Sequence, residues 1–226
     1  MAIFHILNSI KINIKKYVFL FFINKLIIRY FRTRKKIMSL PQPFIVKGAT
    51  IGSPKDKNHK ITISPGCVIH PQAIINAKNG PIIIGERNLI EERTSIINCN
   101  PDGSPLIIGS DNVFENGCDV RANRIESFCT IGIQSTVSNG IILEDGVILA
   151  ARVNLSAEDA KQSDGNEKRA ITIIPSKTSI FGQNSEHFRK MSEMPGNQIQ
   201  QLEYLREILP KFHTIQTWNN ERQMIV

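Results

Sequence analysis

Histidine is the side chain that most often acts as a general base or a zinc ligand near neutral pH, and this chain has five. They are His5, His59, His70, His187 and His213. None of them falls between positions 71 and 186, although a catalytic zinc site needs three protein ligands and an open position for water. We expect His70, beside Ile69, to be a surface residue.

The four cysteines are equally poor candidates for chemistry. They are Cys67, Cys99, Cys118 and Cys129, and no Cys-x-x-Cys pair occurs among them. Their number and spacing do not indicate a disulfide framework. Three of the four, Cys67, Cys118 and Cys129, occupy the small inward position of the repeat, and we interpret these as small core residues. The protein is expected to come from a reducing compartment.

Glu91 and Glu92 are adjacent carboxylates, a residue type that acid–base catalysis uses. Neighbouring residues on a strand point to opposite faces, so these two should not act on one substrate. With the histidines and cysteines, this leads us to predict no catalytic, cofactor-binding or metal-binding residue, and no cofactor.

A repeat of six residues organises the chain. It is unbroken through Ile125, Ile131, Val137, Leu143, Leu149 and Leu155. A helix has a period near 3.6 and an alternating strand a period of 2, so neither explains it. A fixed short period is typical of a β-solenoid, in which three units make one coil of about 18 residues. The sequence therefore predicts an all-β fold, a hexapeptide-repeat solenoid; a β-sandwich with many short strands is the alternative.

Three stacked columns of inward aliphatic residues follow from this period. The first is predicted to hold Ile45, Ile63, Ile84, Ile108, Ile125, Leu143 and Ile174. The second is predicted to hold Ile51, Ile69, Ile90, Phe114, Ile131, Leu149 and Ile180. The third is predicted to hold Ile75, Ile96, Val120, Val137 and Leu155, with its first member lost to a loop.

Small or β-branched residues recur four positions after the aliphatic ones, as a narrow coil requires beside its corners. They are Ala49, Cys67, Ala73, Thr94, Cys118, Cys129, Ser135, Val147, Val153 and Thr178.

Three irregular stretches interrupt the repeat, and two short units mark its corners. Ser53 to Lys60 is expected to be a polar loop that replaces one face of the first full coil, and Asn100 to Pro105 is a turn-rich insertion of six residues. Gly85 to Asn88 and Gly109 to Asn112 share the pattern Gly-x-x-Asn, which we interpret as corners that need positive φ. Ser156 to Arg169 is expected to be a mobile loop.

The period becomes helical after the solenoid. An apolar stripe is formed by Ile199, Leu202, Leu205, Ile208 and Leu209. It predicts one C-terminal α-helix that ends at Pro210 and packs on a flank of the solenoid. No pattern is evident after His213.

Charge separates the first 38 residues from the rest. They carry nine of the 28 Lys and Arg residues and no acidic residue, which leaves 19 basic and 20 acidic residues elsewhere. The body therefore has no electrostatic footprint for nucleic acid. We predict three parts: an extension over 1–38 that is not part of the fold, a solenoid over 39–183, and a helix with a tail over 184–226.

Three interpretations of residues 1–38 remain open. They can be a mitochondrial presequence, a segment on a membrane surface, or an upstream extension with Met38 as the usual start. We favour the upstream extension. The longest uncharged run near its middle, Tyr17 to Asn24, is too short for a membrane span of roughly 20 residues.

Hexapeptide solenoids host two well-known chemistries, acyl transfer with a histidine base and zinc-dependent carbonic anhydrase activity. For the first, the solenoid offers His59 and His70, neither in a recognisable motif. For the second, the histidine pair that γ-type carbonic anhydrases hold within their coils is absent. A hexapeptide acyltransferase and a γ-carbonic-anhydrase-like mitochondrial protein are kept as the alternative functions.

Three runs resemble the dynactin subunit 6 family: Gly80 to Glu92, Leu106 to Gly117, and Leu202 to His213. The resemblance extends from about Ile61 to His213. It implies a left-handed parallel β-helix, an exception to the usual right-handed crossover. It also implies a non-enzymatic subunit of the dynactin pointed-end complex, which caps the actin-like filament and supports dynein-driven transport along microtubules.

The partners that this resemblance implies are dynactin subunit 5 as a similar second solenoid, subunit 4, and the pointed-end actin-related protein. The implied location is the cytoplasm and cytoskeleton, with no nucleic acid, small-molecule substrate or membrane span. Independently of the resemblance, the ends of a solenoid have strand edges that must be paired or covered. A partner stacked nearby would protect them.

Overall fold

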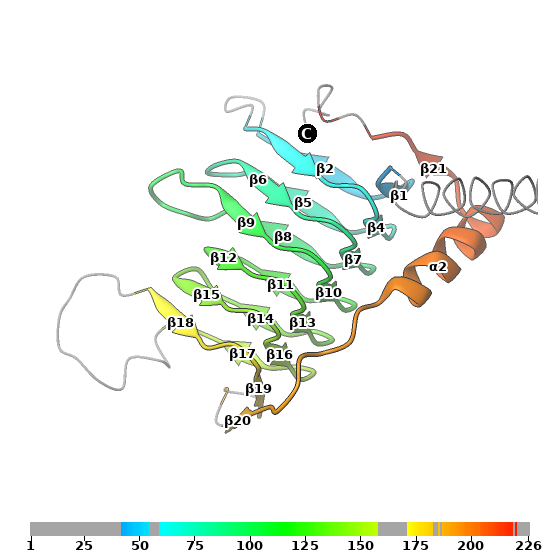
Figure 1. The fold of residues 1–226 in the computed structure, drawn as a ribbon. Helices are drawn as coiled ribbons and strands as arrows, with labels where there is room; N and C mark the ends of the chain where they lie inside the picture. Colours follow the sequence, from blue (N-terminus) through cyan, green and yellow to red (C-terminus); the bar gives the residue numbers. More distant parts are fainter. Residues whose placement is uncertain are drawn as a thin grey trace, which may run out of the picture. The chain divides into compact units, whose positions relative to one another are not determined.

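A computed structural model describes residues 42–54, 59–157, 171–182, 185, 187–218 and 220, all within the unit Pro41–Val226 (Figure 1). The predicted extension over 1–38 and residues 158–170 of the predicted loop lie outside these residues. The three-part division of the chain stays a prediction.

Short strands stack into three parallel sheets, so that the chain winds as a left-handed solenoid (Figure 1). Sheet I contains the parallel strands β1 (Phe44–Val46), β4 (Val68–Ile69), β7 (Leu89–Ile90), β10 (Val113–Phe114), β13 (Thr130–Ile131), β16 (Ile148–Leu149) and β19 (Thr178–Phe181). Sheet II contains β2 (Thr50–Gly52), β5 (Ile74–Asn76), β8 (Ser95–Ile97), β11 (Asp119–Val120), β14 (Thr136–Val137) and β17 (Asn154–Leu155). Sheet III contains β3 (Ile61–Ile63), β6 (Ile82–Ile84), β9 (Leu106–Ile108), β12 (Arg124–Ile125), β15 (Ile141–Leu143) and β18 (Thr172–Ile174).

The predicted inward columns are confirmed from Ile63 onward, but the first two members are assigned to the wrong columns. Ile45 pairs with Ile69 in sheet I, and Ile51 pairs with Ile75 in sheet II. Each pair is 24 positions apart, six more than a coil of about 18 residues. The stretch after Gly52 is therefore an insertion at a corner, and it does not replace a face as expected.

The ten small or β-branched residues that were predicted beside the corners are all buried, which confirms that prediction. The Gly-x-x-Asn units are corners, but positive φ is carried by Arg87 (54°) and Asp111 (60°), which corrects the expectation for glycine and asparagine. Glycine is needed there for space: a Cβ on Gly85 would lie 2.5 Å from the carbonyl oxygen of Gly109 in the next coil.

Buried asparagines hold these corners together. The Asn88 side chain donates to the carbonyl oxygens of Gly85 (2.8 Å) and Gly109 (2.9 Å), and its Oδ1 accepts from the backbone of Asn112 at 3.0 Å. Asn112 in turn accepts from the backbone N–H of Cys129 at 2.7 Å. Three successive coils are thus linked through side-chain amides at one corner.

The C-terminal segment confirms the predicted helix on a flank. Helix α2 (Ile199–Phe212) places Leu202 and Leu209 among the outward side chains of sheet I, and Leu205 is partly buried beside them (Figure 1). Those outward side chains are Val46, Val68, Leu89 and Val113. Pro210 lies inside α2 and does not end it, which corrects the prediction. Pro210 lacks the N–H that would bond to the carbonyl group of Arg206, and its ring crowds that carbonyl; the helix continues for only two residues beyond it.

Two antiparallel strands, which the sequence did not predict, cover both edges of sheet I. Strand β20 (His187–Lys190) pairs with β19, and β21 (Ile215–Gln216) pairs with β1. Beyond β21, Trp218 packs against the core, and the Asn220 side chain bonds to both the N–H (3.1 Å) and the carbonyl oxygen (3.4 Å) of Ile63. The segment after α2 therefore covers the first coil.

We predict that Leu143→Asp severely destabilises the protein. Leu143 is fully buried in its column, and an unpaired buried carboxylate costs several kcal/mol or more. Ile142→Asp, on the outward side of the same strand, is the control and should lower the melting temperature much less. Equal melting temperatures for the two variants would contradict the inward register.

We predict that Leu202→Asp releases α2 while the coils stay folded, since Leu202 is 4% exposed against sheet I and each coil contacts its neighbours only. The expected loss is about 2–4 kcal/mol of helix docking. Limited proteolysis should cleave the segment after residue 190, with unchanged β-sheet circular dichroism. Tyr204→Asp, at a side chain 61% exposed, is the matched control. A helix that resists protease as well in Leu202→Asp as in the control would disprove docking through this face.

Candidate interaction surfaces

His70 is buried, with an exposed fraction of 7%, so the expectation of a surface residue is wrong. Its Nδ1 lies 2.7 Å from Oε1 of Glu92, which belongs to the next coil and covers it. Burial acts to raise the pKa of Glu92, but the bond with His70 and neighbouring hydrogen bonds outweigh it and hold that pKa below its ordinary value. His70 therefore serves as a link between coils.

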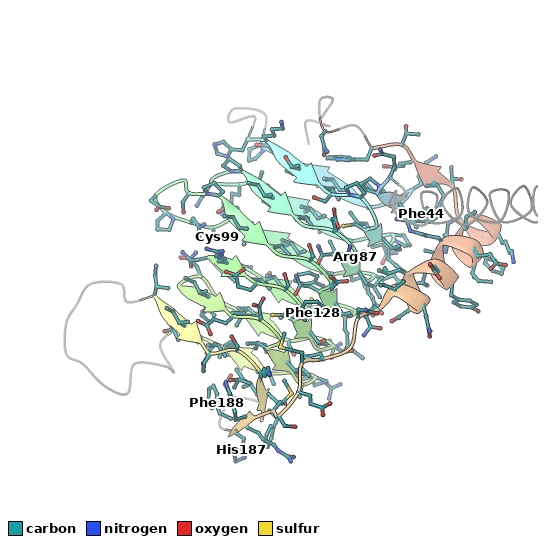
Figure 2. All side chains as sticks on the ribbon, in the orientation of Figure 1. Phe44, Arg87, Cys99, Phe128, His187 and Phe188 are labelled. Atoms are coloured by element: carbon teal, nitrogen blue, oxygen red, sulfur yellow. The ribbon has the colours of Figure 1, made fainter. Side chains whose placement is uncertain are left out.

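The other described histidines lie apart from this pair. The Nδ1 of His59 is 3.0 Å from the carbonyl oxygen of Ala77, and His187 on the exposed strand β20 lies 5.1 Å from the Phe181 ring (Figure 2). His213 follows α2, while His5 is outside the described residues. Across the described ranges, no three His, Cys, Asp or Glu side chains gather as a metal ion would need.

The two adjacent glutamates also reach different partners. Glu91 accepts the backbone N–H of Asn116 at 3.0 Å, whereas Glu92 faces His70. Burial raises the pKa of Glu91. Both carboxylates join one coil to its neighbour, and they do not face a common point where a substrate would bind.

All four cysteines are free thiols. Burial raises the pKa of Cys67 to about 11 and the pKa of Cys118 and Cys129 to about 12, which suppresses the reactive thiolate. Cys99 is partly exposed, near the corner between sheets II and III (Figure 2). The three buried cysteines are small core residues, as predicted.

The outer faces of the three sheets differ in chemistry. The outer row of sheet I is covered by α2 over its first four strands. The outer face of sheet II is mostly polar, with Ile74 and Ile97 as its apolar residues, and its longest row consists of Thr50, Ile74, Ser95, Asp119, Thr136 and Asn154. The outer row of sheet III is apolar in four of its six positions, and it consists of Thr62, Ile83, Ile107, Arg124, Ile142 and Ile173.

We name Ile83, Ile107, Arg124, Ile142 and Ile173 the isoleucine stripe. Ile83, Ile107 and Ile173 are 41%, 37% and 57% exposed. The single cation of the stripe, Arg124, is bound to Glu126 at 2.6 Å. Apolar side chains that are neighbours on adjacent strands, as Ile83 and Ile107 are on one side of Arg124 and Ile142 and Ile173 on the other, indicate an interaction surface, because scattered ones are normal but adjacent ones are less so.

An acidic margin borders the isoleucine stripe along the corner that leads to sheet I. It consists of Glu86, Glu126, Glu144 and Asp145. Arg87, at the same corner, donates two bonds of 2.7 Å to Asp111 and one of 2.8 Å to Glu86, so it compensates part of this margin. Since Arg124 is bonded to Glu126, two of the four carboxylates of this margin are paired with arginines.

The sequence contained a signal for this surface that reasoning from the period of six missed. Strands β6, β9 and β15 read Ile-Ile-Ile, Leu-Ile-Ile and Ile-Ile-Leu. A strand that is buried on one face should alternate apolar and polar residues. Three consecutive aliphatic residues in each of these strands indicate that the outward, middle residue is also suited to burial against another surface.

Comparison with known proteins gives the family. No protein-family model matches the chain. It is 34% identical to dynactin subunit 6 of Danio rerio over 75% of this chain and 85% of that protein. It is 35% identical to dynactin subunit 6 of Xenopus tropicalis, over 75% and 82%, and 31% identical to that of Caenorhabditis elegans, over 75% and 86%.

Among solved structures, a hexapeptide transferase family protein from Anaplasma phagocytophilum aligns with a TM-score of 0.49 and 18% identity, covering 73% of this chain and 85% of that one. None of the described helices is long and apolar enough to cross a membrane. With the identities to dynactin subunit 6 in three animals, over most of each protein's length, the chain belongs to the dynactin subunit 6 family.

Proposed function

We propose that this chain is a non-enzymatic structural subunit of dynactin, placed in the pointed-end complex that caps the actin-like filament. Its expected partners are subunit 5, subunit 4 and the pointed-end actin-related protein. We expect it to act in the cytoplasm and at the cytoskeleton, where it supports dynein-driven transport.

The observation that carries this proposal is the isoleucine stripe. A solenoid draws its stability from inward columns, so an outward row of isoleucines adds little to folding and exposes apolar area to water. Such a row is favourable only where another protein covers it. An assembly subunit needs a rigid surface of this kind, and the stacked coils supply the rigidity.

The groups with catalytic potential support the same proposal. His70 is engaged with Glu92, Glu91 is engaged with the backbone of Asn116, and the buried thiols are held protonated. A general base must reach a proton of its substrate within hydrogen-bond distance. These side chains are instead committed to contacts between coils.

We predict that the purified chain, produced together with the three proposed partners, elutes with them as one stoichiometric assembly. The same preparation should contain well below one zinc per chain and should show neither carbon dioxide hydration nor acetyl transfer. Size-exclusion chromatography with mass spectrometry and metal analysis measure these outcomes.

The matched control is Leu143→Asp, which should lose assembly because the coils no longer fold. A chain that is folded by circular dichroism but elutes alone would contradict the proposed function. So would near-stoichiometric zinc together with hydration activity, which would favour the carbonic-anhydrase-like alternative.

A further inference from the structure

We propose that Asn79 is a site of covalent modification, at which the side-chain amide is lost and an aspartate or isoaspartate forms. Asn79 and Gly80 lie in the bulge between β5 and β6, at a corner between sheets II and III (Figure 1). The modification adds a negative charge at this corner, so the charge that a molecule carries there depends on its age. The inference concerns the chain itself and does not depend on the proposed function.

The reaction is a ring closure within the backbone. The nitrogen of Gly80 attacks Cγ of Asn79, so that an N–Cγ bond forms and the bond from Cγ to Nδ2 breaks. Ammonia leaves with the proton that the Gly80 nitrogen gives up, and a cyclic succinimide remains. Water then opens the ring. Its attack on Cγ gives aspartate, and its attack on the main-chain carbonyl carbon of Asn79 gives isoaspartate.

The fold requires glycine at the attacking position. A Cβ on Gly80 would lie 2.4 Å from the carbonyl oxygen of Gly103 in the next coil, a separation that Cβ atoms do not tolerate. Because glycine has no side chain, its backbone nitrogen is the least hindered and closes such a ring most readily. The close stacking of the coils therefore places the most reactive kind of neighbour directly after Asn79.

The peptide group between Asn79 and Gly80 must rotate before the ring can close, and no hydrogen bond opposes that rotation. Neither the carbonyl oxygen of Asn79 nor the N–H of Gly80 has a hydrogen-bond partner among the described residues, and neither has the side-chain amide of Asn79. Both residues lie outside the flanking strands. Although Gly80 is buried, Asn79 is partly exposed, so water reaches the amide that leaves and the ring that forms.

The sequence has two other Asn-Gly pairs, and the first of them, Asn116 with Gly117, is held at both ends of its peptide group. The carbonyl oxygen of Asn116 accepts the backbone N–H of Gln134 at 3.0 Å. The N–H of Gly117 donates to the carbonyl oxygen of Glu92 at 2.9 Å. This peptide group cannot rotate without the loss of two bonds between coils.

The second pair, Asn139 with Gly140, is held in the same way. The carbonyl oxygen of Asn139 accepts from the hydroxyl of Ser138 at 3.3 Å, and the N–H of Gly140 donates to Oδ1 of Asn123 at 2.5 Å. The amide that would leave is also bound, because Nδ2 of Asn139 donates to Oδ1 of Asn100 at 3.1 Å. Breaking two such bonds slows ring closure by about tenfold or more.

The test is peptide mapping by mass spectrometry after the folded chain is incubated at mildly alkaline pH, where the attacking nitrogen loses its proton more readily. The peptide that contains Asn79 should change from amide to acid at least about tenfold faster than those that contain Asn116 and Asn139. The same chain unfolded in guanidinium chloride is the matched control. There the three pairs should convert at rates within about threefold of one another, because the fold no longer distinguishes them.

Asn79→Gln is the variant control, since glutamine must close a larger and slower-forming ring. Conversion at position 79 should then fall to background, while the rates at Asn116 and Asn139 stay unchanged. A folded chain in which Asn79 converts no faster than Asn116 and Asn139 would overturn the inference. So would an equal preference for Asn79 in the unfolded chain, because the local sequence and not the fold would then select the site.

Discussion

The close stacking of successive coils is the constraint on which the rest of the structure depends. Backbone hydrogen bonds join each coil to the next not only in the strands but also at the corners, as between Gly85 and Ile108 (2.8 Å) and between Gly109 and Ile125 (2.8 Å). At this separation a side chain at some corner positions has no room, and glycine is required. Inside, only stacked aliphatic residues and small neighbours fill the narrow coil. Polar side chains such as Asn88 are accepted there because they bond to the carbonyl groups that the corner exposes.

This constraint explains which features the sequence predicts and which it hides. Inward columns repeat in sequence because they repeat in space, so the core from Ile63 onward was predictable. An insertion at a corner changes sequence distance without changing the stacking, which is why Ile45 and Ile51 were assigned to the wrong columns. The burial of His70 depends on Glu92 in the following coil, 22 positions away, and no local pattern encodes it. The edge strands β20 and β21 form only because a distant edge is available.

Inward and outward side chains are under different constraints in this fold. Inward side chains must pack against the equivalent side chains of the adjacent coils. They therefore follow the period of six and tolerate few residue types. Outward side chains do not pack against neighbouring coils in this way, and their chemistry differs between the three sheets. The row of sheet I is covered by α2, that of sheet II is mostly polar, and that of sheet III is the isoleucine stripe. We therefore expect functional residues where a strand departs from the alternation of apolar and polar residues, whereas the period of six indicates only the fold.

The cover over the first coil has a consequence for how the protein is made. Ile63 is synthesised 157 residues before Asn220, and strand β1 likewise precedes its partner β21 by most of the solenoid. Coils can stack one upon another as they emerge, since each needs only its predecessor. The edge at strand β1, however, stays open until the segment that carries β21 and Asn220 has been synthesised. A nascent chain that lacks this segment therefore has an unpaired β-edge that attracts other strands.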